Sequence, residues 1–241
     1  MNGDVVLRGD LFAPVTSAIG FLRAPLDVVA EGLASWRRKI HGSAQLEPLP
    51  GGLFSNLSVL EPLTGGVRPR ELVVATRNPD WTAIVDCGIQ GGDPSTTVGY
   101  LARTLQVQGV AVVSIPDVSG VRGKPVRYGA RQFEMFAPIK TEFLNYVRSV
   151  SVVRDGTRWR FDASGTVQDF EDVEAYKRRS VADKFSGTML SDYAAALGLR
   201  PFDEDFYSGP CVLVRNPATP PSGAVVLSLR DAQRRAGIVP E

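Results

Sequence analysis

Residues Tyr146–Phe161 read YVRSVSVVRDGTRWRF, two runs rich in Val, Tyr, Trp and Phe on either side of a short polar turn. β-Branched and aromatic residues favour strands. The Asp155-Gly156 pair permits the positive backbone dihedrals of a two-residue hairpin turn. The stretch therefore predicts an antiparallel β-hairpin, and it sets the fold class for the rest of the chain.

A second hairpin is predicted from Glu71–Thr76 and Trp81–Asp86, joined by the turn sequence Arg-Asn-Pro-Asp. Residues 128–137 predict a further strand, with Arg131 and Glu134 facing outward. Apolar spacing and capping residues predict helices over 28–41, 94–105, 171–184, 187–197 and 229–236. Strands joined by hairpins, with helices inserted in blocks, indicate an α+β fold with a mostly antiparallel sheet.

The chain of 241 residues is long enough for one large domain. Residues 1–24 have weak periodicity and are expected to form an N-terminal arm or a short strand. Residues 25–215 carry the α+β pattern, with Asp27 as the expected cap of the first helix and Gly42 as its end. Residues 216–241 begin with a Pro-rich break and continue into a short strand and a helix.

The charge balance argues against nucleic acid and anionic membranes as partners, because 27 basic and 26 acidic residues leave a net charge of +1. No apolar run approaches the roughly 20 residues that span a bilayer. The two cysteines, Cys87 and Cys211, lie far apart and are expected to be free thiols. These features predict a cytoplasmic protein, and the Ala-, Arg-, Val- and Gly-rich composition predicts a bacterial one.

The stretch Gly88–Gly99, GIQGGDPSTTVG, has the glycines of a phosphate-binding loop. It lacks the Lys and hydroxyl that follow the glycines in such loops. Asp93 instead occupies the position of a helix N-cap, and Pro94 suits the first helical position. The stretch is therefore interpreted as the start of a helix.

Few residues suggest catalysis. The single histidine, His41, follows three cations at a predicted helix end and is interpreted as a helix-terminal residue. One His and two distant Cys form no metal-binding pattern, so neither a metal nor a cofactor is expected. The remaining candidates are the carboxylates Asp86, Asp203 and Asp205, and Cys87, which is interpreted first as a core residue.

Arginines that alternate with aromatic residues favour a protein interface, so Arg154, Arg158 and Arg160 are the expected partner-binding residues. Strand alternation places Arg158 and Arg160 on the face opposite Trp159. The sequence thus favours a non-enzymatic domain that binds another protein, for example an immunity-type protein that neutralises a toxin. Two alternatives stay open: a small hydrolase or transferase using carboxylates or Cys87, and a subunit of a larger bacterial assembly. A pocket that gathers the candidate carboxylates would favour the enzyme.

Overall fold

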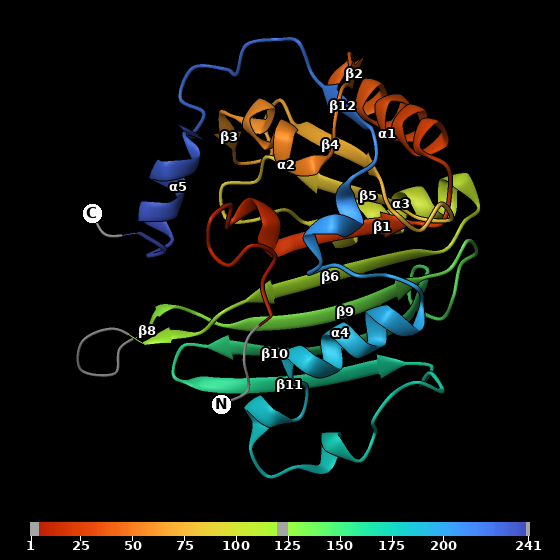
Figure 1. Cartoon of the computed structure of the whole chain (residues 1–241), viewed down its shortest axis with the longest axis vertical. Coiled ribbons are helices and arrows are strands. Elements are labelled where there is room, and N and C mark those ends of the chain that lie inside the picture. Colours follow the sequence, from red (N-terminus) through yellow and green to blue (C-terminus); the bar gives the residue numbers. More distant parts are fainter. Residues whose placement is uncertain (1–4, 120–124, 240–241) are drawn as a thin grey trace.

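Both predicted hairpins are present in the computed structural model, which describes residues 5–119 and 125–239 (Figure 1). In the first hairpin, β4 (Arg70–Ala75) pairs antiparallel with β5 (Thr82–Asp86). In the second, β10 (Tyr146–Asp155) pairs with β11 (Arg158–Gly165). The turn of this second hairpin is one residue later than predicted. Asp155 faces Arg158, so the two turn residues are Gly156, with a positive φ of +62°, and Thr157.

The two hairpins belong to one antiparallel sheet of nine strands, which confirms the predicted α+β class. From one edge to the other, its strands are β11, β10, β9 (Ala130–Phe136), β6 (Gly109–Ile115), β1 (Ala18–Leu22), β5, β4, β12 (Cys211–Arg215) and β2 (Gln45–Leu49). Two small sheets pair β3 (Leu63–Thr64) with β13 (Val226–Leu227), and β7 (Val118–Ser119) with β8 (Pro125–Arg127).

The segment expected as an arm or short strand contributes a central strand. All five residues of β1 are buried, and β1 pairs with β5 on one side and β6 on the other. A strand buried on both faces carries no alternation of polar and apolar residues, which is why residues 1–24 show weak periodicity. The single domain therefore depends on a strand that precedes residue 25.

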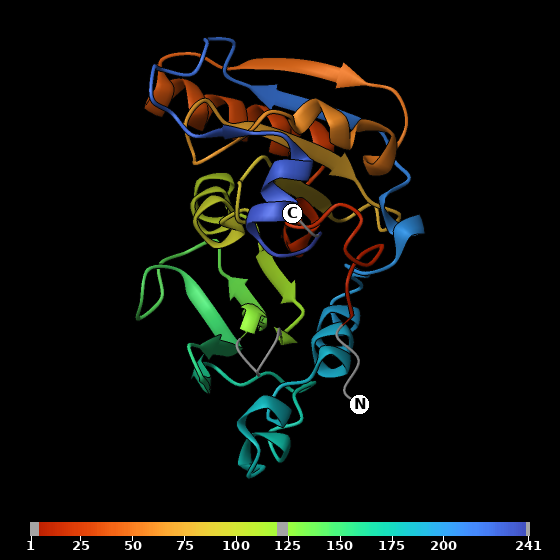
Figure 2. The ribbon, with the colours of Figure 1, turned by 90° about the vertical axis from the view of Figure 1, so that its left-hand side faces the viewer.

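Helices cover both faces of the sheet (Figure 2). They are α1 (Leu26–His41), α2 (Leu53–Asn56), α3 (Pro94–Leu105), α4 (Gly187–Ala196) and α5 (Leu229–Arg235). The helices α1 and α3 share one apolar cluster with one face of the sheet, and α2 and α4 share another with the opposite face. Within the described residues, no helix is both long and apolar enough to cross a membrane.

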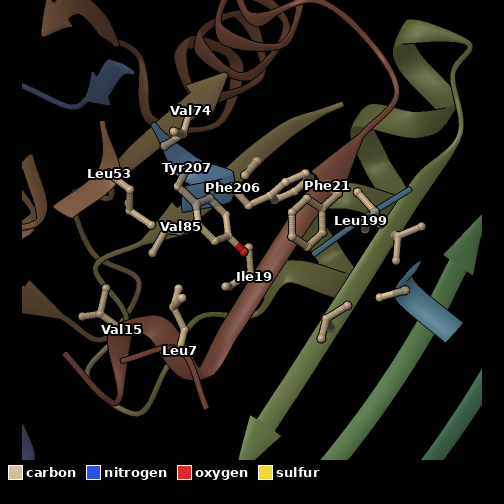
Figure 3. Packing of buried hydrophobic residues seen from close by; sticks show 14 of the residues in the cluster. Leu7, Val15, Ile19, Phe21, Leu53, Val74, Val85, Leu199, Phe206 and Tyr207 are labelled. Carbon is tan, nitrogen blue, oxygen red and sulfur yellow. The ribbon is translucent and has the colours of Figure 1, made fainter. Parts of the chain in front are cut away.

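The larger cluster is organised around aromatic rings (Figure 3). Phe21 of β1 lies 6.4 Å from the ring of Phe206 and 6.5 Å from that of Tyr207, both from the short 3-10 helix Glu204–Tyr207. Offset ring pairs at such distances add to the stabilisation that comes from burial itself. These rings therefore pack directly against β1 on this face of the sheet.

Two glycines let α3 lie close against the other face. A Cβ on Gly20 of β1 would lie 2.5 Å from Val98 of α3, and one on Gly109 of β6 would lie 2.4 Å from the same side chain. Any larger residue at either position would push the helix away from the strands. The close approach fixes where the first turn of α3 lies, and that turn borders the site described below.

The predicted helix ends are mostly correct. Asp93 accepts a hydrogen bond from the Thr96 N–H, and Ser186 accepts one from Met189, so both caps are confirmed. Gly42 ends α1 in the left-handed conformation, as predicted. The N-cap position of α1 is occupied by Pro25 and not by Asp27, which lies in the first turn.

The helix predicted over 171–184 is wrong. The chain forms two separate 3-10 turns there, Ala175–Lys177 and Val181–Asp183, because Arg178 adopts an extended conformation between them. The predicted orientation of Arg131 and Glu134 is also wrong, since both side chains are buried. Tertiary contacts override local preference in both cases.

Candidate functional site

A cavity of about 460 Å³ lies where β4 and β5 meet α1 and α3. Three carboxylates, one guanidinium and several threonine and glycine residues are among the groups that surround it. The lining residues are Trp36, Arg37, Thr64, Gly65, Gly66, Pro69, Glu71, Asp86–Asp93, Thr96 and Thr97. Clefts of this size that gather a few polar groups are the usual sites for small ligands.

The carboxylates of Glu71 and Asp86 are cross-strand neighbours, because β4 and β5 pair these two residues directly. Glu71 is only 1% exposed. Arg37 of α1 donates from Nε to its Oε2 at 2.8 Å and from a terminal nitrogen to its Oε1. This two-point contact fixes the position of the Glu71 side chain, since paired charge-assisted hydrogen bonds are strong and directional.

Contacts on either side hold Arg37 in place. Its guanidinium lies over the ring of Trp36 at 4.2 Å from the centroid, and it also reaches Thr97 Oγ1 at 3.4 Å. Trp36 in turn stacks on Tyr100 of α3, with ring centroids 4.4 Å apart. Residues of α1, α3 and β4 thus form one rigid wall of the cavity.

The Asp86 carboxyl has a pKa close to neutral pH. Burial raises its pKa to about 6, and the negative charge of Glu71 adds to the rise. The Gly88 N–H donates to its Oδ1 at 2.8 Å and, together with Arg37, opposes the shift. Within the described part of the chain, its Oδ2 accepts no hydrogen bond and stays available to a ligand. A carboxyl with these properties can give or take a proton at neutral pH.

The glycines of Gly88–Gly99 wrap closely around Asp86. A Cβ on Gly92 would lie 2.2 Å from Asp86 Oδ2, and one on Gly88 would lie 2.5 Å from the Gly91 carbonyl oxygen. The stretch is a helix start, as the Asp93 cap confirms, and the same residues also form a wall of the cavity. The sequence interpretation identified the first role and missed the second.

Cys87 is the neighbour of Asp86 but has a different environment. Its side chain is buried in the larger apolar cluster, and its Sγ accepts a hydrogen bond from the Arg70 N–H at 3.2 Å. Burial raises the pKa of this thiol. A buried thiol with a raised pKa is a poor nucleophile, so the interpretation of Cys87 as a core residue is confirmed.

The other candidates lie outside the cavity. His41 is the last residue of α1, and burial and the nearby Arg37 lower its pKa. Asp203 caps the 3-10 helix Glu204–Tyr207 through the Asp205 N–H and pairs with Arg200. Among the residues that the structure describes, no three His, Cys, Asp or Glu side chains are placed to hold a metal ion.

The three arginines expected to bind a partner do not share one surface. Arg158 and Arg160 are exposed, and both lie on the same face of β11. Arg154 faces Trp159 across the hairpin and therefore points to the opposite face, where it pairs with Asp117. Trp159 and Phe161 are half-buried against the larger cluster, as predicted.

Sequence reasoning missed Glu71 and Arg37, although a signal for Glu71 was available. Counting outward from the closed end of the first hairpin pairs Leu72 with Val85 and then Glu71 with Asp86, the register observed. Two carboxylates at one cross-strand pair are unfavourable without a cation nearby. Nothing local indicated that Arg37 would supply it.

The arrangement unites a fixed ion pair, a carboxyl that titrates near pH 6 and a glycine-rich wall at one cavity. Such a set can bind a polar molecule and transfer a proton to or from it. Comparison with protein-family models, curated proteins and solved structures finds no match to this chain.

Proposed function

We propose that this chain is an enzyme of the hydrolase or transferase type that binds a small polar substrate in the Asp86 cavity. Asp86 would act there as the general base or acid. The observation that carries the proposal is the environment of Asp86: a free Oδ2 at the cavity and a pKa raised to about 6. General acid–base groups work best when their pKa lies close to the operating pH.

Glu71 and Arg37 have a supporting part in this mechanism. The Arg37 guanidinium holds the Glu71 side chain in place, and the charge of Glu71 helps to raise the pKa of Asp86. At pH 7, which lies above this pKa, the ionised form of Asp86 that can accept a proton is the major one. Glu71 is thus a positioning residue, and Asp86 is the group that meets the substrate.

The proposal is tested first without a substrate. We expect carbon-detected NMR titration of the Asp86 carboxyl to give a midpoint near pH 6. Asp203, which also caps a backbone N–H but lies outside the cavity, serves as the reference carboxyl. A midpoint for Asp86 below pH 4 would remove the basis for a general base at neutral pH.

Activity is then sought on a panel of p-nitrophenyl esters, phosphates and glycosides. For any compound turned over, kcat/KM should rise with pH through a limb near 6, because the ionised form of Asp86 is the base. Asp86→Asn should lower kcat/KM by about 10²–10⁴-fold. The control Asp203→Asn should leave it within about threefold. Turnover that survives in Asp86→Asn would contradict the assignment.

A second candidate function is protein binding at the exposed face of β11. Arg158 and Arg160 favour it, because both project from an edge strand of the sheet on a stiff hairpin. Little conformational entropy is lost when such a surface binds. An immunity-type protein that neutralises a toxin would use a surface of this kind.

We expect the double variant Arg158→Ser, Arg160→Ser to weaken a partner captured from the native host by about 1–4 kcal/mol. Its melting temperature should change little, since both side chains are exposed. The control variant Arg178→Ser, Arg179→Ser removes the same charge from another exposed segment. If both double variants bind the partner as tightly as the wild type, this surface is not the interface.

A further inference from the structure

A second acidic site lies on the same side of the sheet as α3 and centres on Glu134 of β9. Glu134 is cross-strand from Ala111, which packs under α3, and from Ser149 of β10. Its side chain is buried, with 6% of the residue exposed, although it carries a carboxylate. It is absent from the walls of the Asp86 cavity, so its environment needs a separate explanation.

The side chains of Ser95, Gln132 and Ser149 lie close to the Glu134 carboxylate and oppose the rise in its pKa that burial causes. The Ser149 hydroxyl donates to Oε1 at the long distance of 3.4 Å. Within the described residues, no hydrogen bond of sound geometry reaches the buried Oε2. A buried carboxylate oxygen without a partner costs free energy, and such groups in native proteins commonly mark a place where a ligand belongs.

Glu134 lines a hollow of about 1000 Å³ between the strands and the loop that precedes β10. Its walls are Glu134, Thr141, Glu142, Phe143, Tyr146, Val147, Ser149, Ser164, Gly165 and Thr166. These ten residues include two carboxylates and no Lys, Arg or His. A negatively charged hollow without a basic residue is suited to a positively charged ligand.

Aromatic rings stand at the mouth of this hollow. Phe143 is 69% exposed, and its ring centroid lies 5.8 Å from that of Tyr146. The face of an aromatic ring attracts a cation and also packs against the alkyl chain that carries it. Carboxylate, hydroxyl and ring together match a cationic head on an apolar stem.

We propose that the Glu134 hollow binds an organic cation whose head is a guanidinium or alkylammonium group. The head donates to Glu134 Oε2 and to the hydroxyl oxygens of Ser149 and Ser164. The stem lies against Phe143 and Tyr146. A neutral molecule of the same shape supplies fewer donors and no charge, so it leaves the carboxylate uncompensated.

Argininamide is the probe, and citrullinamide, in which a neutral urea replaces the guanidinium, is its matched control. Each is titrated into ¹⁵N-labelled protein while the backbone amide signals are followed. We expect argininamide to shift the amides of β9, β10 and residues 141–143 in a saturable manner. We expect citrullinamide to bind at least tenfold more weakly.

Three variants locate the binding. Glu134→Gln should weaken argininamide at least tenfold, whereas Glu142→Gln, which removes an exposed carboxylate at the rim, should weaken it less than threefold. Phe143→Ala alters only an exposed side chain, keeps the fold, and should weaken binding three- to tenfold. Asp86→Asn should bind like the wild type, which separates this site from the proposed active site.

Three results would overturn the proposal. These are equal affinity for the two amides, wild-type affinity in both Glu134→Gln and Phe143→Ala, and shifts confined to residues of the Asp86 cavity. The activity of Asp86→Asn tests the proposed enzymatic function only, and its result does not change the conclusion about the Glu134 hollow.

Discussion

Replacing Glu171 by leucine is expected to lower the free energy of unfolding by about 3–5 kcal/mol. Glu171 accepts from Arg148 Nε at 2.8 Å and from a second Arg148 nitrogen at 2.7 Å, and the two side chains are 1% and 3% exposed. The Tyr176 hydroxyl donates to the same carboxylate at 2.7 Å. Without Glu171, the Arg148 guanidinium stays buried with no charge to compensate it.

Unfolding in guanidinium chloride measures this loss of stability, and two control variants show where it comes from. The double variant Arg148→Met, Glu171→Leu should recover most of the stability, because an apolar pair of similar volume removes both buried charges. Glu174→Leu breaks a surface pair with Lys177 whose side chains are 74% and 72% exposed, and should cost less than about 1 kcal/mol. A loss below 1 kcal/mol in Glu171→Leu would show that the pair contributes little.

The second large effect is a gain in the free energy of unfolding, and it concerns Asp86. Asp86→Asn is expected to raise the free energy of unfolding at pH 7 by about 1–3 kcal/mol. The pKa of Asp86 rises from 3.8 in the unfolded chain to about 6 in the folded one, so the ionised form is disfavoured by folding. The upper value of about 3 kcal/mol corresponds to the full rise in the pKa of Asp86. Water that reaches Oδ2 through the cavity reduces it.

The pH dependence gives the check. A group whose pKa rises on folding contributes stability below pH 4, and that contribution is lost as the pH rises through about 6. Wild type and Asp86→Asn should therefore be closest in stability at pH 4 and furthest apart at pH 7. A variant that is less stable than the wild type at pH 7 would make Asp86 a structural carboxylate. Gain of stability with loss of activity is typical of a functional residue.

Local signals were sufficient for the hairpins and most helix ends. The Asp93 and Ser186 caps act within three residues of themselves, so the sequence contains all that their prediction needs. The sequence predicted Asp155 and Gly156 as the two turn residues. The observed turn residues are Gly156 and Thr157, because Asp155 pairs with Arg158. The resulting shift leaves the alternation of β11 as predicted.

The failed predictions depend on distant contacts. Residues 171–184 have helical spacing, yet the Glu171 side chain accepts two hydrogen bonds from Arg148 of β10. These contacts hold the segment against the sheet as separate turns. The strand β1 was not identified because it is buried on both faces and lies between partners that follow it by about 60 and 90 residues.

The α+β class, the two hairpins, the caps of α3 and α4 and the opposite orientation of Arg158 and Trp159 could be predicted from the amino-acid sequence, because each of these depends on neighbouring residues. Which charges are buried depends on the packing of the whole chain. Glu71, Asp86, Glu134 and Glu171 look like ordinary surface carboxylates in the sequence, and the strand order and helix packing enclose them. Burial shifts the pKa of a carboxylate and can leave its oxygens without hydrogen-bond partners. Burial itself depends on residues that are distant in the sequence.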